Sequence, residues 1–368
     1  MRIACLYFPT SSVGGIATNT AALRAEAKRR GDTFHVLISA NVKSHEFYTH
    51  EVRRVRGGDT YIDVDGYAPH HATNRAHTIR RIAGEYDLIY LAFLCPHPTK
   101  SYTVPAFLPL LEELGLFLPV VGRISDGYWA TYEEWGLAAA ATCARMVVAM
   151  EPYLPPGLVE ALPTLPIVYG RPFDPEPPEG KIEREARSVA WIAQWKAIKG
   201  IHRFLPLVPQ LPGRVDLYSN GILYYQKRTE LDWMAAIGED RFQGFNGAGR
   251  ATFHGWQPLP VIRAALRRAD FMPEFQGMGK PRYAAYRAGA TNNTTMEALF
   301  YECTPVIPQI VIDSAGIPSE SVIGIRSWDD IVPALSGNRA PRPDLGRQWV
   351  LDMFHVSMIY DRFFGGLL

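Results

Sequence analysis

The chain has 368 residues, and its 38 Lys and Arg against 37 Asp and Glu give a formal charge of +1. A nearly neutral chain has no global attraction to nucleic acid, so a polyanion would have to be bound by a local patch. The composition of 47% hydrophobic, 12% aromatic and 20% charged residues excludes a disordered chain. The length suits two domains of the usual size or one large one, and it excludes a small disulfide-stapled scaffold.

Four cysteines, at 5, 95, 143 and 303, are scattered along the chain. Their spacing suggests no disulfide framework and matches no paired-cysteine zinc site. The apolar opening at 2–8 is too short for the core of a signal peptide, and no apolar run of about 18 residues occurs elsewhere. We therefore expect a soluble, cytoplasmic protein in a reducing compartment.

Strand-like and helix-like patterns alternate in the first half of the chain. A βαβ unit is expected first, with a strand at 2–8, a loop at 9–15, a helix at 16–30 and a strand at 34–39. Further strands are expected at 88–93, 119–124, 146–150 and 166–168, with helices at 102–114 and 129–143. The alternation predicts a parallel sheet covered on both faces.

A proline-rich polar stretch that begins at Pro172 forms neither regular element and marks a domain boundary. We expect one domain at 1–171, a second at 172–345 and a C-terminal helix at 346–368, amphipathic and packed on the body. Strands in the second domain are expected at 188–192, 214–219, 252–255, 269–272, 305–310 and 322–325, and helices at 200–208, 259–268, 293–302 and 328–335. The expected fold class is α/β, with two domains of similar size.

A loop that ends in Gly14 and Gly15 joins the first strand to the first helix. Glycines let a ligand approach the backbone, and the free N–H groups of a helix start can face an anion. The loop has neither the GxGxxG spacing of dinucleotide folds nor the GxxxxGK[ST] pattern of phosphate-loop nucleotidases. It is a candidate phosphate loop, and the alternative is a tight turn without a ligand.

Lys199 is expected at the start of a helix after the first strand of the second domain. A cation is unfavourable at the positive end of a helix dipole unless an anion also lies there, so its position suggests a bound anion. The alternative is a solvated surface lysine.

A second helix start carries Asn293, Thr294 and Thr295, with Glu297 about one turn further on. Asn and Thr side chains cap the free N–H groups or leave them for a phosphate, and a carboxylate accepts hydrogen bonds from sugar hydroxyls. The alternative is a plain capped helix.

In this order, the segments resemble the retaining, glycogen-synthase-like glycosyltransferases of family 4. The resemblance rests on the Gly-Gly loop, on Lys199-Gly200, and on the helix carrying Glu297 before a Thr-Pro-Val strand. It is closest to the branch of T-even phage DNA α-glucosyltransferases, with Trp191-Ile-Ala-Gln and the linker-like Ile-Val-Tyr in support. Two positions depart from the family. Gln194 replaces the usual arginine, for which Lys196 is a candidate substitute, and Gly289 replaces the first glutamate, which the phage branch also lacks.

The resemblance implies a GT-B fold, in which two Rossmann-like domains face each other across a cleft. It also implies a nucleotide-sugar donor, which we expect to be a UDP-sugar, with no tightly bound cofactor and no divalent metal. The implied donor-binding residues are Gly14, Gly15, Gln194, Lys196, Lys199, Asn293, Thr294, Thr295 and Glu297. Two residues are candidates for catalysis. Lys199 would stabilise the leaving diphosphate, and Asp126, after the strand 119–124, would orient or deprotonate the acceptor hydroxyl.

The acceptor implied by the closest branch is a hydroxymethylated pyrimidine in double-stranded DNA. Eleven Lys or Arg against seven Asp or Glu lie between residues 24 and 81, so Arg53, Arg54 and Arg56 are candidates for phosphate contacts. Tyr128 and Trp129 are candidates to stack on a flipped base. The alternatives are a solvated surface for the arginines and a packed core for the aromatic residues.

Two other functions stay open at this stage. One is the same chemistry on a lipid-linked or polysaccharide acceptor, although no convincing basic amphipathic surface helix is present. The other is a non-catalytic protein that binds a sugar nucleotide or nucleic acid, for which the residues at 194 and 289 are the best support. We expect a monomer with no membrane partner.

Overall fold

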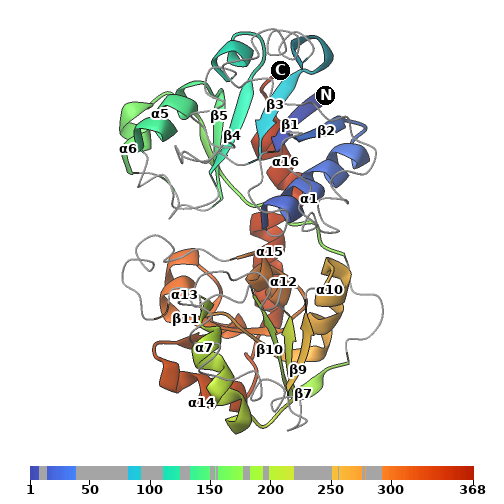
Figure 1. The fold of residues 1–368 in the computed structure, drawn as a ribbon, viewed down its shortest axis with the longest axis vertical. Coiled ribbons are helices and arrows are strands. Elements are labelled where there is room, and N and C mark those ends of the chain that lie inside the picture. The colour runs from blue at the N-terminus through green and yellow to red at the C-terminus, as the bar shows by residue number, and fades with distance from the viewer. Residues whose placement is uncertain are drawn as a thin grey trace. The chain divides into compact units, whose positions relative to one another are not determined.

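The computed structural model of the chain describes residues 1–7, 15–38, 82–92, 111–124, 133–149, 154, 156–176, 183–193, 199–218, 251–255, 257–275, 278 and 292–368. The chain divides into two compact units. Unit 1 comprises Met1–Asp174 and Phe354–Leu368, and unit 2 comprises Pro175–Met353. Each unit contains a six-stranded parallel sheet with helices packed on it (Figure 1).

The sheet of unit 1 has the strand order β2-β1-β3-β4-β5-β6. Its strands are β1 (Arg2–Tyr7), β2 (Thr33–Ile38), β3 (Leu88–Leu91), β4 (Val120–Ile124), β5 (Arg145–Val148) and β6 (Ile167–Tyr169). The named helices are α1 (Gly15–Arg29), α5 (Glu133–Ala141), α6 (Pro156–Ala161) and α16 (Val356–Phe364), and residues 111–115 form a further helical turn. Within the described residues, the elements predicted from hydrophobic periodicity are confirmed to within a few residues.

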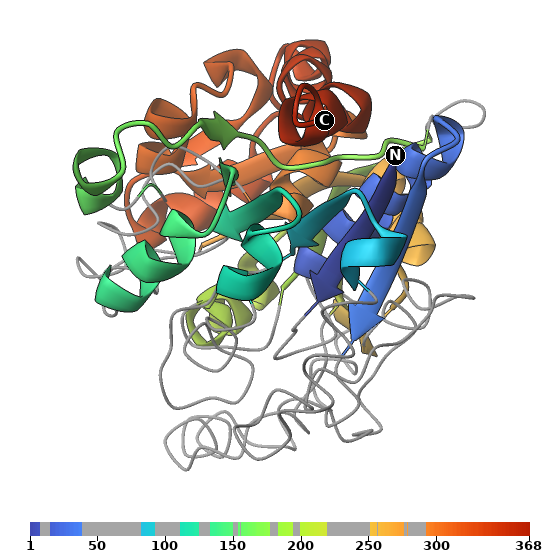
Figure 2. The same cartoon turned by 90° about the horizontal axis from the view of Figure 1, so that it is seen from above.

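Side chains of this sheet point alternately to two apolar clusters, as expected for strands buried on both faces. Leu6, Leu91 and Met146 belong to the cluster beneath α5 and α6. Ile3 and Tyr90 belong to the cluster beneath α1 and α16. Seen from above, α16 in dark red and α5 in green lie on opposite sides of the sheet (Figure 2). Unit 1 is therefore a three-layer α/β unit.

Helix α16 is part of unit 1 although it follows unit 2 in the sequence. Its buried side chains include Ile359, Phe363 and Phe364, and the Phe364 ring packs edge-on against Tyr90 with centroids 5.5 Å apart. Its C-terminal end is held by Arg145, whose Nη1 donates to the carbonyls of residues 362, 363 and 365 at 2.9–3.0 Å.

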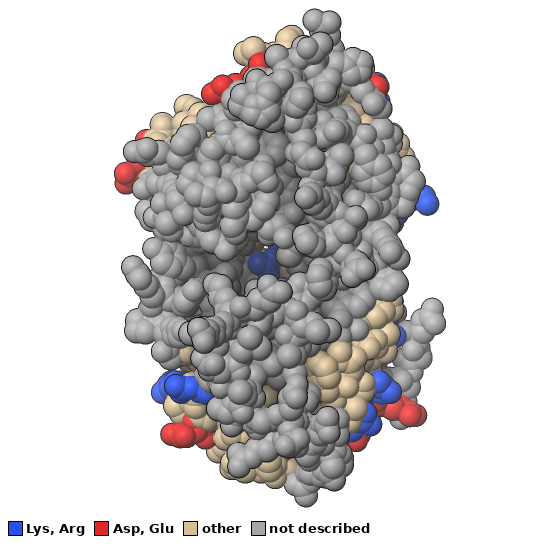
Figure 3. All heavy atoms as spheres, viewed as in Figure 1, with Lys and Arg blue, Asp and Glu red and all other residues tan. Residues whose placement is uncertain are grey.

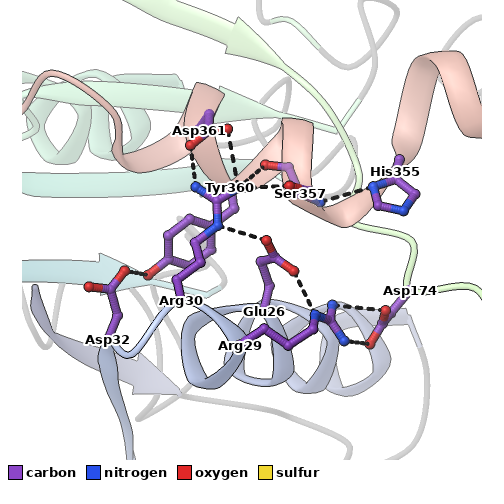
Figure 4. Close-up of polar contacts among 9 residues, drawn as sticks. All are labelled: Glu26, Arg29, Arg30, Asp32, Asp174, His355, Ser357, Tyr360 and Asp361. Atoms are coloured by element: carbon purple, nitrogen blue, oxygen red, sulfur yellow. Dashed lines mark hydrogen bonds and ion pairs between the residues drawn. The ribbon is translucent and has the colours of Figure 1, made fainter.

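Polar contacts also join α1 to α16, as Figure 4 shows. Arg30 pairs with Asp361 and donates to the carbonyl and hydroxyl oxygens of Ser357, both at 2.8 Å. The Tyr360 hydroxyl donates to Asp32 at 2.9 Å. The α1 face turned to α16 thus carries acids and bases that are already matched.

The prediction of a single helix at 346–368 is wrong, because this part of the chain forms two helices, α15 (Pro343–Phe354) and α16, with a break at His355. His355 has the extended ψ of 128°, and its Nδ1 accepts from the backbone N–H of Ser357 at 3.3 Å. Phe173 lies beside the break, donating to Phe354 O at 2.9 Å and accepting from Val356 N at 2.8 Å. At the break, backbone hydrogen bonds to Phe173 therefore take the place of hydrogen bonds within a helix. The units divide at Asp174/Pro175, where the sequence expectation was 171/172.

The sheet of unit 2 has the order β12-β11-β10-β7-β8-β9. Its strands are β7 (Glu185–Ile192), β8 (Val215–Tyr218), β9 (Ala251–Gly255), β10 (Ala269–Pro273), β11 (Thr304–Pro308) and β12 (Ile323–Ile325). Its helices are α7 (Ile201–Phe204), α10 (Leu259–Arg268), α12 (Asn293–Phe300), α13 (Gln309–Ala315), α14 (Ile331–Ser336) and α15, with 3-10 turns η5 (Leu205–Gln210), η7 (Ser319–Ser321) and η8 (Trp328–Asp330).

The helix expected at 200–208 is the four-residue α7 followed by the 3-10 turn η5. Pro206 and Pro209 cannot donate backbone hydrogen bonds, so a regular α-helix cannot continue through them. The short element still buries Phe204 and Leu205 in the core of unit 2.

In both sheets, the chain adds strands first on one side of the first strand and then on its other side, so the first strand marks a reversal point. In unit 1 the chain adds β2 on one side of β1 and then β3 on the other, and in unit 2 it adds β8 and β9 on one side of β7 and then β10 on the other. Ligands of open parallel sheets bind outside the carboxyl ends of the strands at such points. The residues after β1 and β3 and those after β7 and β10 are therefore where a site is expected.

Candidate functional site

The carboxyl ends of β7 and β10 carry an ion pair at the reversal point of unit 2. Lys199 follows β7, and Glu274 directly follows β10. Lys199 Nζ lies 3.2 Å from Glu274 Oε1, and their side chains are 17% and 9% exposed. Glu274 is held in place because its backbone N–H donates to Val306 O of β11 at 2.9 Å. Lys199 is thus not a freely solvated lysine, and Glu274 supplies a negative charge beside it.

The turn after Lys199 requires glycine. Gly200 has a φ of +78°, which residues with a side chain rarely adopt. A Cβ atom at this position would also lie 2.5 Å from Cη2 of Trp328. The indole ring packs on Phe275 with centroids 5.4 Å apart, and Phe275 follows Glu274 in the chain. One packed group therefore fixes the backbone on both sides of the ion pair.

Helix α12 begins at the same edge of the sheet, because it precedes the parallel strand β11. Its cap is Asn292, whose side-chain oxygen accepts from Thr295 N at 2.8 Å. Asn293 and Thr294, in the first turn, are partly exposed, whereas Thr295 is buried. The cap takes one of the N–H groups that a helix start cannot use internally.

Glu297 lies further along α12 and is buried against Arg263 of α10. Arg263 Nε lies 3.1 Å from Glu297 Oε2, and its Nη2 lies 3.0 Å from Oε1. The two side chains are 6% and 5% exposed. Burial alone would lower the pKa of Arg263, but the charge of Glu297 and its hydrogen bonds raise it above the usual arginine value. Arg263 also pairs at 2.9 Å with Glu176, which is 62% exposed.

Several residues predicted to be functional lie outside the described residues. They are Gly14, Arg53, Arg54, Arg56, Asp126, Tyr128, Trp129, Gln194 and Lys196, together with Gly289. Gly15 is described as the first residue of α1. The structure thus brings Lys199 to the sheet edge at which α12 begins, and it places Glu297 against Arg263.

Charge is mixed on the described residues of the face drawn in Figure 3. In the view of Figure 3, the described Lys and Arg side chains occur in small groups, with Asp and Glu nearby. A positive patch that would attract a polyanion is not seen among the coloured residues of this face.

Sequence reasoning missed Glu274 and Arg263. The rule that drew attention to Asp126, a carboxylate just after a buried strand, applies equally to Glu274. Arg263 gave no such signal, because an arginine in an amphipathic helix is normally solvated, and only its contact with Glu297 explains its burial.

Within the described ranges, no helix is long and apolar enough to cross a membrane. The same part of the chain contains no group of three or more His, Cys, Asp or Glu side chains that could hold a metal ion.

Comparisons with solved structures identify the architecture. The chain is similar to an alpha-glucosyltransferase in complex with UDP-glucose and DNA containing an abasic site, with a TM-score of 0.68 and 12% identity over 98% of both chains. A complex of an alpha-glucosyltransferase with UDP and a 13-mer DNA containing an HMU base gives a TM-score of 0.64 and 10% identity over 98% of this chain and 97% of that one. The fold is that of the GT-B glycosyltransferases.

The same GT-B architecture is found in Anabaena HepE in complex with UDP-glucose, with a TM-score of 0.65 and 14% identity over 99% of this chain and 98% of that one. Neither the models of protein families nor the curated proteins match this sequence. At 10–14% identity, these likenesses establish the GT-B fold and leave the substrate to be argued from residues.

Proposed function

We propose that the protein is a retaining glycosyltransferase that moves a sugar from a UDP-sugar to the hydroxyl of a hydroxymethylated pyrimidine in DNA. The observation that carries the proposal is the lysine at the reversal point of a GT-B unit. Lys199 is largely buried at the carboxyl edge where ligands of such sheets bind, with α12 beginning at the same edge. Similar GT-B structures contain UDP or UDP-glucose, and both alpha-glucosyltransferase structures described above also contain DNA.

In this proposal, Lys199 binds the diphosphate of the donor. As the bond from the sugar to the phosphate breaks, negative charge grows on the leaving diphosphate, and a fixed cation stabilises it. The first turn of α12, at Asn293 and Thr294, adds N–H groups and the positive end of a helix dipole. Gly14, Gly15, Gln194 and Lys196 complete the proposed donor site.

Replacement of Lys199 by Ala should lower kcat/KM on the order of 10²- to 10³-fold, as for other donors that stabilise transition-state charge. Because the change also leaves Glu274 unpaired, the double variant Lys199→Ala/Glu274→Gln separates lost catalysis from lost stability. Lys28→Ala, at an exposed position of α1, is the matched control. A Lys199→Ala enzyme within threefold of wild type would contradict the assignment.

Glu297 is proposed to accept hydrogen bonds from the ribose hydroxyls. A carboxylate offers about four lone-pair sites, and Arg263 takes up to three of them, so a ribose would share the carboxylate with the arginine. Glu297→Gln should weaken UDP binding while 2′-deoxy-UDP binding changes less. Calorimetry with both nucleotides measures this difference, and an equal loss for both would contradict the ribose contact.

Asp126, after β4, is proposed to orient or deprotonate the acceptor hydroxyl. Arg53, Arg54 and Arg56 are proposed to contact DNA phosphates, with Tyr128 and Trp129 stacking on the base. Each neutralised phosphate adds about 0.9 to the slope of log K against log salt. Charge reversal at the three arginines should flatten that slope and leave UDP affinity unchanged.

The deciding experiment is transfer to defined acceptors. Unmodified duplex DNA and duplexes with hydroxymethylated pyrimidines are incubated with the protein and a panel of UDP-sugars, and the released nucleosides are analysed by mass spectrometry. A mass increase of one hexose or pentose on the modified base alone is expected, and it should disappear with Asp126→Ala. Hydrolysis of UDP-sugar without transfer to any DNA would contradict the DNA acceptor.

A carbohydrate acceptor is the second candidate. A sucrose-phosphate synthase from Thermosynechococcus elongatus has a similar structure, with a TM-score of 0.61 and 13% identity, so this fold also occurs in an enzyme that acts on carbohydrate. Transfer to oligosaccharides with no transfer to modified DNA would favour this candidate, and the donor site proposed above would be unchanged.

A further inference from the structure

Arg123 is a charged side chain inside the sheet of unit 1. It lies on β4, whose five residues are all buried, and it is 1% exposed. Within the part of the chain that the structure describes, neither its Nε nor its Nη1 has a hydrogen-bond acceptor. These two nitrogens carry three N–H bonds. A buried cation with two of its three nitrogens unsatisfied by the described residues is unfavourable, so the fold keeps a costly group at this position.

Arg123 points to the α1/α16 face of the sheet, near its carboxyl edge. Side chains alternate along a strand, and Val121, two residues earlier, belongs to the cluster beneath α1 and α16. Tyr90 of β3 pairs in register with Val121 and is thus a diagonal neighbour of Arg123. The Tyr90 hydroxyl is buried beside Arg123, and its own proton has no acceptor within the described ranges. Burial raises the pKa of Tyr90 to about 12, while the charge of Arg123 acts to lower it.

Helix α1 begins at the same edge and lies on the same face. It follows the carboxyl end of β1 and ends just before Thr33, which pairs with Arg2 at the opposite edge. The positive end of its dipole is therefore directed to the carboxyl edge. In its second turn, the hydroxyl of Thr20 is fully buried and has no hydrogen-bond partner within the described ranges.

Acidic side chains on this face lie at the other edge, where they are already neutralised. Glu26 accepts from Arg29 at 2.8 Å and from Arg30 at 2.7 Å, and Asp361 pairs with Arg30 (Figure 4). Asp32 accepts from the Met1 amino group at 2.7 Å. The described carboxylates of α1 and α16 are thus engaged away from Arg123.

We propose that Arg123 forms part of a buried oxyanion site at the carboxyl edge of the unit 1 sheet and that its ligand is a phosphate group. A phosphate presents several acceptor oxygens, which suits the unused N–H groups of Arg123, two hydroxyls and a helix start. The proposal of an oxyanion site rests on residues of unit 1 only and does not depend on the proposed function. Assigning its phosphate to the donor diphosphate or to the DNA backbone rests on the proposed function.

Thermal unfolding with and without inorganic phosphate or pyrophosphate, against sodium chloride of equal ionic strength, tests the site. Phosphate should raise the Tm of the wild type, and Arg123→Met should abolish that rise, because a ligand stabilises only the state that binds it. Without phosphate, Arg123→Met should itself raise the Tm by about 2 to 4 °C, because an unpaired buried charge is removed. Arg123→Lys keeps the charge and should retain part of the response.

Arg145→Met is the matched control. Arg145 lies in the same sheet, but its Nη1 already donates to three carbonyls at the end of α16. Its replacement should lower the Tm and leave the phosphate response intact. An Arg123→Met protein that is less stable than wild type, with an unchanged phosphate response, would overturn the proposal, because Arg123 would then have its acceptor within the folded chain.

Two binding measurements distinguish the source of the phosphate. UDP affinity is measured by calorimetry and affinity for a short DNA duplex by fluorescence anisotropy, each with wild type and Arg123→Met. A rise in Kd of about tenfold to a hundredfold in one measurement identifies the source. Unchanged affinity in both would overturn both assignments. A wild-type protein that responds to phosphate but transfers no sugar would contradict the proposed function and leave the oxyanion site in place.

Discussion

Removal of Arg263 should destabilise unit 2 far more than removal of an exposed arginine would. Arg263→Met leaves Glu297, 5% exposed, as a buried carboxylate without its guanidinium. Breaking a buried pair from one side costs about 3 to 5 kcal/mol. With a Tm shift of about 2 to 4 °C per kcal/mol for a unit of this size, the Tm should fall by roughly 6 to 20 °C. Glu176 adds little to the loss, because it is 62% exposed and water replaces its partner.

The double variant Arg263→Met/Glu297→Met tests whether the unpaired carboxylate of Glu297 causes the loss of stability. Replacing both members of a buried pair by apolar side chains is often neutral or stabilising, so the double variant should recover most of the lost stability. Urea unfolding followed by circular dichroism gives the free energies of unfolding of the wild type, Arg263→Met, Glu297→Met and the double variant. A single variant within about 1 kcal/mol of wild type, or a double variant no more stable than Arg263→Met, would refute the reasoning.

Three further outcomes are expected. Gly200→Ala should lower the Tm and weaken UDP binding, because its left-handed φ of +78° and its contact with Trp328 leave no room for a Cβ; an unchanged Tm in calorimetry would contradict this. Burial raises the pKa of Cys143 and Cys303 to about 12, so at about pH 8 their thiols should stay protonated and resist iodoacetamide until the protein unfolds, as peptide mass mapping can check. Deletion of residues 354–368 should prevent unit 1 from folding, since α16 supplies Ile359, Phe363 and Phe364 to its core, and a native-like near-ultraviolet circular dichroism spectrum would show otherwise.

The fold was largely predictable because the chain follows two simple periodicities. Short apolar strands alternate with helices, as in residues 259–273, where the predicted helix at 259–268 matches α10 and the following strand matches β10 to within one residue. Local periodicity could not reveal the break at His355, because it depends on backbone bonds to Phe173, about half the chain away. The early end of helix α7, by contrast, could have been predicted from the two prolines that follow it in η5.

The candidate site was less predictable, because polar pairs form between distant segments. Lys199 was found from its expected place at a helix start, but its partner Glu274 follows a different strand. Glu297 was expected to face a ligand, and the sequence contains no pattern that links it to Arg263. Arg123 escaped notice because one arginine in an otherwise apolar strand gives no sign of whether it reaches solvent.

The position of α16 after unit 2 in the sequence affects how the protein folds as it is made. Unit 2 is a continuous segment, whereas the core of unit 1 is closed by a helix that is translated only after all of unit 2. At about 5 to 20 residues per second, synthesis of the roughly 190 residues after Asp174 takes about 10 to 40 s. During that time, the sheet face beneath α16, including Tyr90, has no cover from its own chain. The order of folding during translation is thus expected to run against the order of the sequence, with unit 2 complete first and unit 1 complete only after α16 has left the ribosome.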